Sequence, residues 1–283
     1  MQKLLVNSIN NFAIDGIFQK FKYFKQLSNT DSIVSKIMKK SLLFLFLGLA
    51  TIGFGQAKNA RVYVFVPGAW DGGWDYRKVD SILTSQGHIV YRPTLTGLGE
   101  RIHLANKDIN LTTHITDIVN LLKFENLHNI ILVGHSYGGI VISGVAEQMP
   151  DRIKQLIYLD AFVPKNGESI QAIIGLAWSQ MIAPKIKDDL IGYPFGPTNP
   201  NPPKDVPQPL KTFTETLTIN NPLVSKIPTA YILMMKDGKG GFEAWGASRA
   251  REKGWKMFTF EGGHYSMRDQ PKALVEKLES VLK

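Results

Sequence analysis

The sequence predicts an α/β fold: a six-stranded, mainly parallel sheet flanked by helices, with a small helical and Pro-rich cap. Three observations lead to this prediction. Short apolar segments alternate with helical patterns, 44% of the 283 residues are hydrophobic, and a Gly-rich turn directly follows one apolar segment. Alternation of this kind is typical of a parallel sheet that helices cover on both faces, with ligands bound at the carboxyl ends of the strands.

The strand candidates are short runs of apolar, β-branched and aromatic residues, and turn residues follow several of them. They cover residues 61–66, 89–91, 130–133, 156–159, 230–234 and 256–260. Between the second and third runs, apolar residues recur at helical spacing from Ile115 to Leu122, and Thr112 or Thr113 is available as the cap. A last helix is expected to open at Asp269, with Pro271 in its first turn.

Residues 164–228 do not fit the alternation, because they separate the fourth and fifth strands by far more than a crossover needs. They hold a candidate helix around 170–182 and then a Pro-rich run at 193–209. We expect this segment to be a cap over the site. The alternative is a surface excursion without function.

The N-terminal part has the pattern of a secretory signal. Met38, Lys39 and Lys40 precede an apolar run at 42–54, and the small residues Gly55 and Ala57 suggest cleavage after Ala57. The run is too short to span a bilayer comfortably, so we expect no membrane anchor after cleavage and a secreted or periplasmic domain at 58–283. Residues 1–37 are interpreted as an upstream over-read or a disordered extension.

Charge and cysteine content exclude several classes of function. The formal net charge is +9, but residues 1–57 carry +5 of it, so the remainder is only mildly basic at +4. Its Lys and Arg residues are scattered, which argues against nucleic-acid binding. Because the chain has no Cys, a disulfide scaffold, a thiolate zinc site and a catalytic Cys are excluded. The histidines lack metal-ligand spacing, so no metal site is expected.

The best candidate for a nucleophile is Ser136, in the G-x-S-x-G run at 134–138 between a predicted strand and a predicted helix. A serine needs a base, and the base needs an acid that fixes its tautomer. His264, after the last strand, is the candidate base, whereas His135 is expected to pack away from the nucleophile. Asp237 is the preferred acid because it follows the strand before that of His264. Asp160 is the alternative.

A developing oxyanion requires hydrogen-bond donors. The backbone N–H groups of Tyr137 and of Ala69, in the Gly-rich loop after the first strand, are the candidates. Aromatic and apolar residues that could line a substrate pocket are Trp70, Trp178, Met181 and Phe195.

Five motifs occur in order: VPGAWDGGW at 66–74, PTLTGLGER at 93–101, LVGHSYGG at 132–139, YLDAFVP at 158–164 and GGHYSMRDQP at 262–271. The chain from about residue 61 to 283 thereby resembles the α/β-hydrolase superfamily. Within it, the chain is similar to small esterases of the EstC type, related to plant methylesterases and hydroxynitrile lyases. The resemblance implies no cofactor, a triad of Ser136, His264 and Asp237, and oxyanion donors at Ala69 and Tyr137.

The chain departs from the family pattern at Pro67, and from the pattern of the lyase branch at Gly68 and Tyr265. Pro67 stands where the family usually has His, which alters the entry to the oxyanion loop. Gly68 and Tyr265 occupy positions where the lyases typically have Thr and Lys, so hydroxynitrile lysis is disfavoured.

The sequence therefore predicts a secreted serine hydrolase that cleaves small carboxylic esters through an acyl-enzyme. An amidase, a lactonase or a perhydrolase with the same triad is the first alternative. A ligand-binding protein on the same scaffold is the second.

Overall fold

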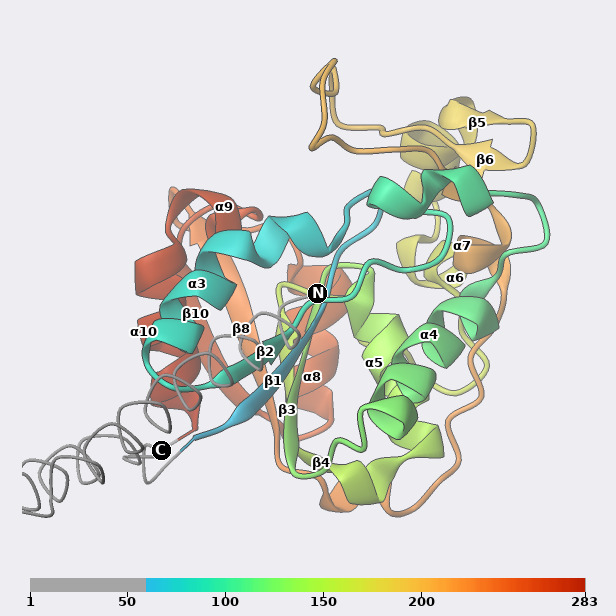
Figure 1. Ribbon diagram of the computed structural model, residues 1–283. Helices are drawn as coiled ribbons and strands as arrows, with labels where there is room; N and C mark the ends of the chain where they lie inside the picture. The colour runs from blue at the N-terminus through green and yellow to red at the C-terminus, as the bar shows by residue number, and fades with distance from the viewer. Residues whose placement is uncertain (1–59, 283) are drawn as a thin grey trace, which may run out of the picture. The chain divides into compact units, whose positions relative to one another are not determined.

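A parallel sheet of six strands forms the centre of residues 60–282, the part of the chain that the computed structural model describes (Figure 1). The signal predicted at 38–57 and the residues before it lie outside this part. The strand order is β10-β8-β4-β3-β1-β2, and the short β9 pairs antiparallel with β8. The strands are β1 Val62–Val66, β2 Ile89–Tyr91, β3 Ile130–His135, β4 Ile153–Leu159, β8 Thr229–Lys236, β9 Lys239–Gly240 and β10 Lys256–Glu261. All six predicted strands are present, which confirms the α/β class.

The strand order reverses direction beside β1. The chain passes from β1 to β2 on one side and then returns to place β3 on the other, with Val66 beside Gly134. Ligands of open α/β sheets bind outside the carboxyl ends of the strands at such a switch point. The loop after β1 and the turn after β3 meet there, and these are the segments in which the sequence placed Ala69 and Ser136.

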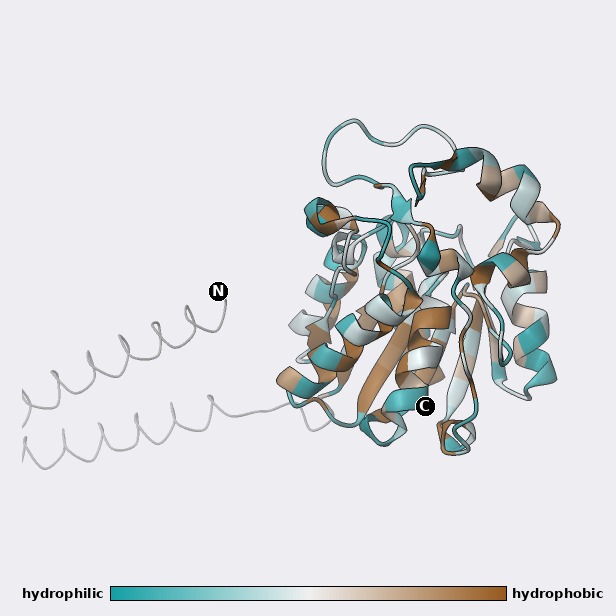
Figure 2. Cartoon of the chain, turned by 90° about the vertical axis from the view of Figure 1, so that its right-hand side faces the viewer, coloured by the Kyte–Doolittle hydropathy of each residue, from teal (hydrophilic) through white to brown (hydrophobic). Residues whose placement is uncertain are grey.

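Helices cover both faces of the sheet because successive side chains of each strand point to opposite sides. Tyr63 and Phe65 of β1 pack in one core with α3 (Arg77–Ser85) and α10 (Pro271–Val281). Val64 and Val66 pack in a second core with α4 (Leu111–Phe124) and α5 (Gly138–Gln148), on the other side of the sheet in Figure 1. Figure 2 shows the apolar strands enclosed between these helices.

Two predicted helix starts are shifted in the structure. Asn110, not Thr112 or Thr113, caps α4: its side chain accepts from the Thr113 N–H, and the Thr113 side chain accepts from the Asn110 N–H. The last helix begins at Pro271 rather than Asp269, because Ser266–Asp269 form a separate short helix, α9. The remaining helical segments outside 164–228 are η1 Gly73–Tyr76, η2 Gly99–Leu104, η3 Pro150–Arg152, η7 Glu243–Ala247 and α8 Ser248–Glu252.

The part of the segment 164–228 from α6 to α7 lies beyond the carboxyl ends of the strands, with β5 and β6 at the top of Figure 1. The chain after α7 then returns past the end of α5 to the start of β8. The helix predicted at 170–182 is divided at Gly175, whose φ of +62° ends the first piece. A small antiparallel sheet of β5, β6 and β7 was not predicted, because two-residue strands leave no periodic pattern. The elements are α6 Ile170–Ile174, η4 Trp178–Ile182, η5 Ala183–Lys185, β5 Ile186–Lys187, β6 Leu190–Ile191, β7 Gln208–Pro209, α7 Lys211–Thr214 and η6 Val224–Lys226.

Within residues 60–282, no helix is both long enough and apolar enough to cross a membrane.

Candidate active site

Ser136 occupies a tight turn between β3 and α5. Its φ of +51° is unusual for a residue with a side chain, and such strain concentrates at functional sites. The turn requires glycine on both sides: a Cβ at Gly134 would lie 2.6 Å from the Gly138 carbonyl oxygen, and one at Gly138 would lie 2.5 Å from that of Val66. These close approaches explain the two glycines of the G-x-S-x-G run. Ser136 lines a cavity beyond the carboxyl ends of the strands.

His264 follows β10 and lines the same cavity as Ser136. Its Nδ1 lies 2.6 Å from Oδ2 of Asp160, which is buried after β4. The other carboxylate oxygen of Asp160 accepts the Met234 N–H at 3.1 Å. Within residues 60–282, Nε2 of His264 makes no hydrogen bond. Donation of Nδ1–H to Asp160 therefore leaves Nε2 as the basic nitrogen.

The predicted pairing of Asp237 with His264 is wrong: Asp160, the alternative, is the hydrogen-bond partner of the imidazole. β8 continues to Lys236, two residues beyond the predicted end at 234, and then forms a hairpin with β9. Asp237 is thereby exposed at the hairpin tip. Asp160 reaches His264 across the end of β8, which lies between β4 and β10.

Ala69 and Tyr137 contribute N–H groups that donate no hydrogen bond within the described residues, as the prediction of oxyanion donors requires. The neighbouring Trp70 N–H is occupied, since it donates to Oε1 of Gln208 at 2.8 Å. Trp70 also has a positive φ, 65°.

Sequence reasoning missed His114, which holds Tyr137 in place. One ring nitrogen, Nδ1, lies 2.9 Å from the Tyr137 hydroxyl, and Nε2 lies 2.9 Å from the Thr96 carbonyl oxygen. Burial lowers the pKa of His114 to about 4, so the ring is neutral: Nε2–H donates to Thr96, and Nδ1 accepts from Tyr137. A lone polar residue on the apolar face of α4 was the available signal.

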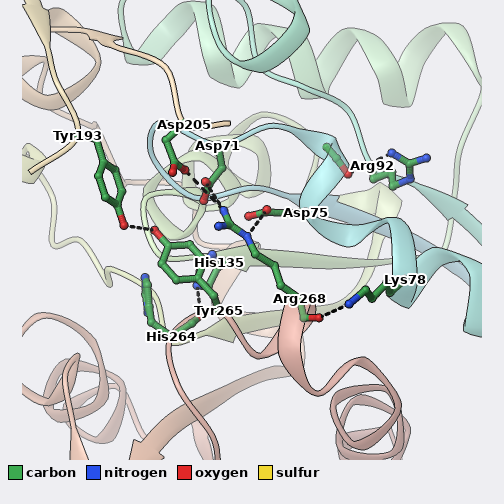
Figure 3. Close-up of polar contacts among 11 residues, drawn as sticks. Asp71, Asp75, Lys78, Arg92, His135, Tyr193, Asp205, His264, Tyr265 and Arg268 are labelled. Carbon is green, nitrogen blue, oxygen red and sulfur yellow. Dashed lines mark hydrogen bonds and ion pairs between the residues drawn. The ribbon is translucent and has the colours of Figure 1, made fainter. Parts of the chain in front are cut away.

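His135 also does more than the predicted packing. Its ring is buried, and Nε2 donates to the His264 carbonyl oxygen at 2.9 Å (Figure 3). Burial, together with the nearby His264 ring, lowers the pKa of His135 well below its usual value. The residue before the serine therefore supports the loop that carries the imidazole.

The cavity has a volume of about 520 Å³ and mainly apolar walls. Three of the four predicted wall residues line it, namely Trp70, Met181 and Phe195. Trp178 does not line the cavity but packs behind it, with its ring centroid 6.2 Å from that of Phe213. The prediction for Trp178 is therefore wrong, because the turn of η4 brings Met181 and Ile182 to the cavity instead. Wall residues that sequence reasoning missed are Phe162, Ile174, Phe213, Phe242 and Trp245.

The described residues contain no group of three or more His, Asp or Glu side chains placed to hold a metal ion. The polar groups that line the cavity include the Ser136 hydroxyl, the His264–Asp160 pair, two tyrosines and two lysines. The N–H groups of Ala69, which lines the cavity, and of Tyr137, next to Ser136 in the chain, donate no hydrogen bond within the described residues. This set can activate a nucleophile and stabilise negative charge on a carbonyl oxygen.

Comparison with known proteins agrees with this chemistry. The sequence model described as "Alpha/beta hydrolase family" matches residues 63–277. A carbendazim-hydrolysing esterase of Nocardioides sp. (strain SG-4G) is 35% identical over 242 residues, which cover 77% of this chain and 98% of that protein. Methylesterase 1 of Arabidopsis thaliana is 28% identical over 137 residues, which cover 44% of this chain and 49% of that protein. The chain is thus related to enzymes that hydrolyse esters.

Solved structures share the fold. An extracellular alpha/beta-hydrolase from a Paenibacillus species aligns with a TM-score of 0.66 at 23% identity, covering 78% of this chain and 98% of that one. Tomato methylketone synthase I, in complex with 2-tridecanone, aligns with a TM-score of 0.64 at 20% identity, covering 79% and 98%.

Proposed function

We propose that this chain, which belongs to the alpha/beta hydrolase family, is a serine esterase that cleaves small carboxylic esters through an acyl-enzyme. The observation that carries the proposal is the His264–Asp160 pair at 2.6 Å, which lines one cavity together with Ser136. The esterase relatives support the same reaction class.

In the proposed mechanism, Ser136 Oγ attacks the ester carbonyl carbon while Nε2 of His264 takes the hydroxyl proton. Asp160 stabilises the resulting imidazolium through Nδ1–H. The Ala69 and Tyr137 N–H groups donate to the oxyanion. The imidazolium then protonates the departing alcohol oxygen, which leaves Ser136 acylated. Water attacks the acyl carbon, again losing its proton to Nε2. The bond between the acyl carbon and Oγ then breaks, the imidazolium returns its proton to Ser136 Oγ, and the carboxylic acid leaves.

The cavity walls support an ester with an apolar or aromatic body. Phe242 stacks on the His264 ring with centroids 4.8 Å apart, and Trp70 and Phe213 lie in contact at 5.6 Å. A cavity of about 520 Å³ accommodates a ligand of modest size. Amides and lactones would use the same groups, so they are tested alongside esters.

The experiment that tests the function is labelling with a fluorophosphonate, followed by peptide mapping. We expect modification at Ser136, none in Ser136→Ala, and a burst of p-nitrophenol from p-nitrophenyl esters. Labelling of another residue would overturn the assignment of the nucleophile. No labelling, together with no turnover of esters, lactones and anilides, would instead favour a ligand-binding protein.

We also propose that the chain is exported, on the basis of the leader pattern at 38–57. N-terminal sequencing of the protein recovered from outside the cytoplasm should give Lys58 as the first residue. Recovery of the full-length chain from the cytoplasm alone would contradict export.

A further inference from the structure

Beside the active site, one arginine contacts three carboxylates, two from the loop and short helix after β1 and one from the segment 164–228 (Figure 3). Arg268 Nε lies 2.6 Å from Asp75, and Nη2 lies 2.7 Å from Asp71 and 3.6 Å from Asp205. The carboxylates are buried, with side-chain exposures of 0%, 1% and 12% for Asp75, Asp71 and Asp205. We call these four residues the Arg268 cluster.

Two aromatic rings fix the plane of the guanidinium. The Arg268 Cζ atom lies 4.2 Å from the centroid of Tyr265 and 4.5 Å from that of Trp74. The Tyr265 hydroxyl in turn lies 3.5 Å from that of Tyr193, in the segment 164–228. A planar guanidinium with several directed donors can hold this arrangement, whereas a Lys ammonium supplies the charge without the fork or the stacking.

The cluster joins the three segments that build the candidate active site. Arg268 is on α9, four residues after His264. Asp71 is two residues after Ala69, in the loop after β1. Asp205 lies in the segment 164–228, and the next residue, Val206, donates its N–H to the Trp70 carbonyl oxygen at 2.9 Å. One side chain thus contacts the imidazole loop, the oxyanion loop and the segment over the cavity.

Charge makes Arg268 necessary to this arrangement. Burial, the Asp75 charge and a hydrogen bond with Asp205 raise the pKa of Asp71 well above its usual value, while the Arg268 charge opposes this rise. Asp75 is affected in the same direction, chiefly by burial. Without the guanidinium, the buried carboxylates would repel one another or take up protons, and the contacts through which Arg268 joins the segments would be lost in either case.

We propose that Arg268 is a positioning residue for ester hydrolysis, which sets the Ala69 amide relative to His264 and holds the Asp205 segment closed over the cavity. The inference rests on the proposed function. Its rival is a salt-bridge cluster that adds only stability. A positioning role predicts that a conservative substitution of Arg268 lowers kcat by more than a control substitution with the same loss of stability. A purely stabilising role predicts the same kcat for both variants.

The chain offers a matched control in Arg249, which makes two hydrogen bonds to Glu168, at 2.6 and 3.1 Å. Its side chain is 17% exposed, compared with 28% for Arg268, and it does not line the cavity. Arg249→Lys therefore removes a partly buried guanidinium fork that binds a single carboxylate and contacts none of the proposed reacting groups.

We expect Arg268→Lys to lower kcat by about 10- to 100-fold, because displacement of a catalytic group by about 1 Å can reduce the rate by that much. Arg249→Lys should lower Tm by a similar amount and leave kcat within twofold. Asp205→Asn changes only the contact between Arg268 and the segment 164–228, so it should mainly raise KM, by about three- to tenfold for bulky esters. If Arg268→Lys keeps the wild-type kcat, or Arg249→Lys loses as much, the positioning role is overturned.

A second measurement separates this inference from the proposed function. Lys204 provides a tryptic site beside Asp205. In native protein, Arg268→Lys should be cut after Lys204 at least fivefold faster than the wild type or Arg249→Lys. A wild type without activity on any ester would reject the esterase proposal, while this cleavage test would still decide whether Arg268 holds the segment. Equal cleavage in all three proteins would reject that role.

Discussion

Two turns at the carboxyl end of the sheet carry aspartates in nearly the same backbone conformation, yet only one contacts the imidazole. Asp160 follows β4 with φ of 45°, and Asp237 follows β8 with φ of 53°. Asp160 is 2% exposed and both of its carboxylate oxygens are hydrogen-bonded, whereas Asp237 is exposed at a hairpin tip. A position at the end of a strand and a left-handed backbone conformation are therefore not enough to bring an aspartate into contact with the imidazole. A buried location from which the side chain reaches the imidazole distinguishes the carboxylate that pairs with His264.

The sharpest test of this comparison exchanges each carboxylate for an amide. Asp160→Asn should lower kcat by about 10³- to 10⁴-fold, because an amide can hold the wrong imidazole tautomer and cannot stabilise the imidazolium. Asp237→Asn should keep kcat within twofold. Steady-state kinetics with a p-nitrophenyl ester checks both, and circular dichroism confirms the fold. The reverse ranking would restore Asp237 as the acid.

The same contrast between buried and exposed positions applies to the aromatic wall. Phe213 is 1% exposed and Phe195 is 57% exposed, although both line the cavity. Phe213→Ala should reduce the free energy of unfolding by about 3–5 kcal/mol, the cost of truncating a buried Phe. Phe195→Ala should change it by less than about 0.5 kcal/mol and should chiefly raise KM. Urea denaturation and kinetics measure the two effects. Equal destabilisation would contradict the assignment of Phe195 to the rim.

The imidazoles of His264 and His114 lie in different surroundings, and the surroundings of His114 predict how stability depends on pH. Asp160 pairs with His264, whereas burial lowers the pKa of His114 from 6.5 to about 4, with Thr96, Asp117 and Arg101 making smaller contributions. The unfolded chain takes up a proton at this residue below about pH 6.5, and the folded chain does so only below about pH 4. Stability is therefore lost as pH falls through this range, by about 3 kcal/mol from His114.

His114→Gln should remove this part of the pH dependence. The variant starts less stable at pH 7, and its difference from the wild type should shrink as the pH falls to 4. Urea midpoints measured at both pH values provide the check. His135 acts in the same direction in both proteins, so it cancels in the difference. A difference that stays constant with pH would show that His114 is not buried as a neutral ring.

Much of the candidate site followed from local pattern. The G-x-S-x-G run between a strand and a helix located Ser136, and the Gly-rich loop after β1 located Ala69, because both depend on residues close together in the chain. The choice between Asp160 and Asp237 could not be made from residues close together in the chain. It depended on β8 continuing to Lys236, which leaves Asp237 exposed at the tip of the β8–β9 hairpin while Asp160 pairs with the imidazole. Trp178 was misplaced because its choice rested on residue type alone, whereas the fold of the segment 164–228 decides which of its side chains line the cavity.

The sequence by itself determined the α/β class, the six strands, the serine turn and the histidine, because hydrophobic periodicity and glycine sterics act over a few residues. Tertiary structure decided which carboxylate orients His264, that His114 and His135 support the site, and that Arg268 joins three segments. Those contacts link residues from 23 to 197 positions apart. They depend on strand order and on the burial of charge, which no local pattern in a single sequence records.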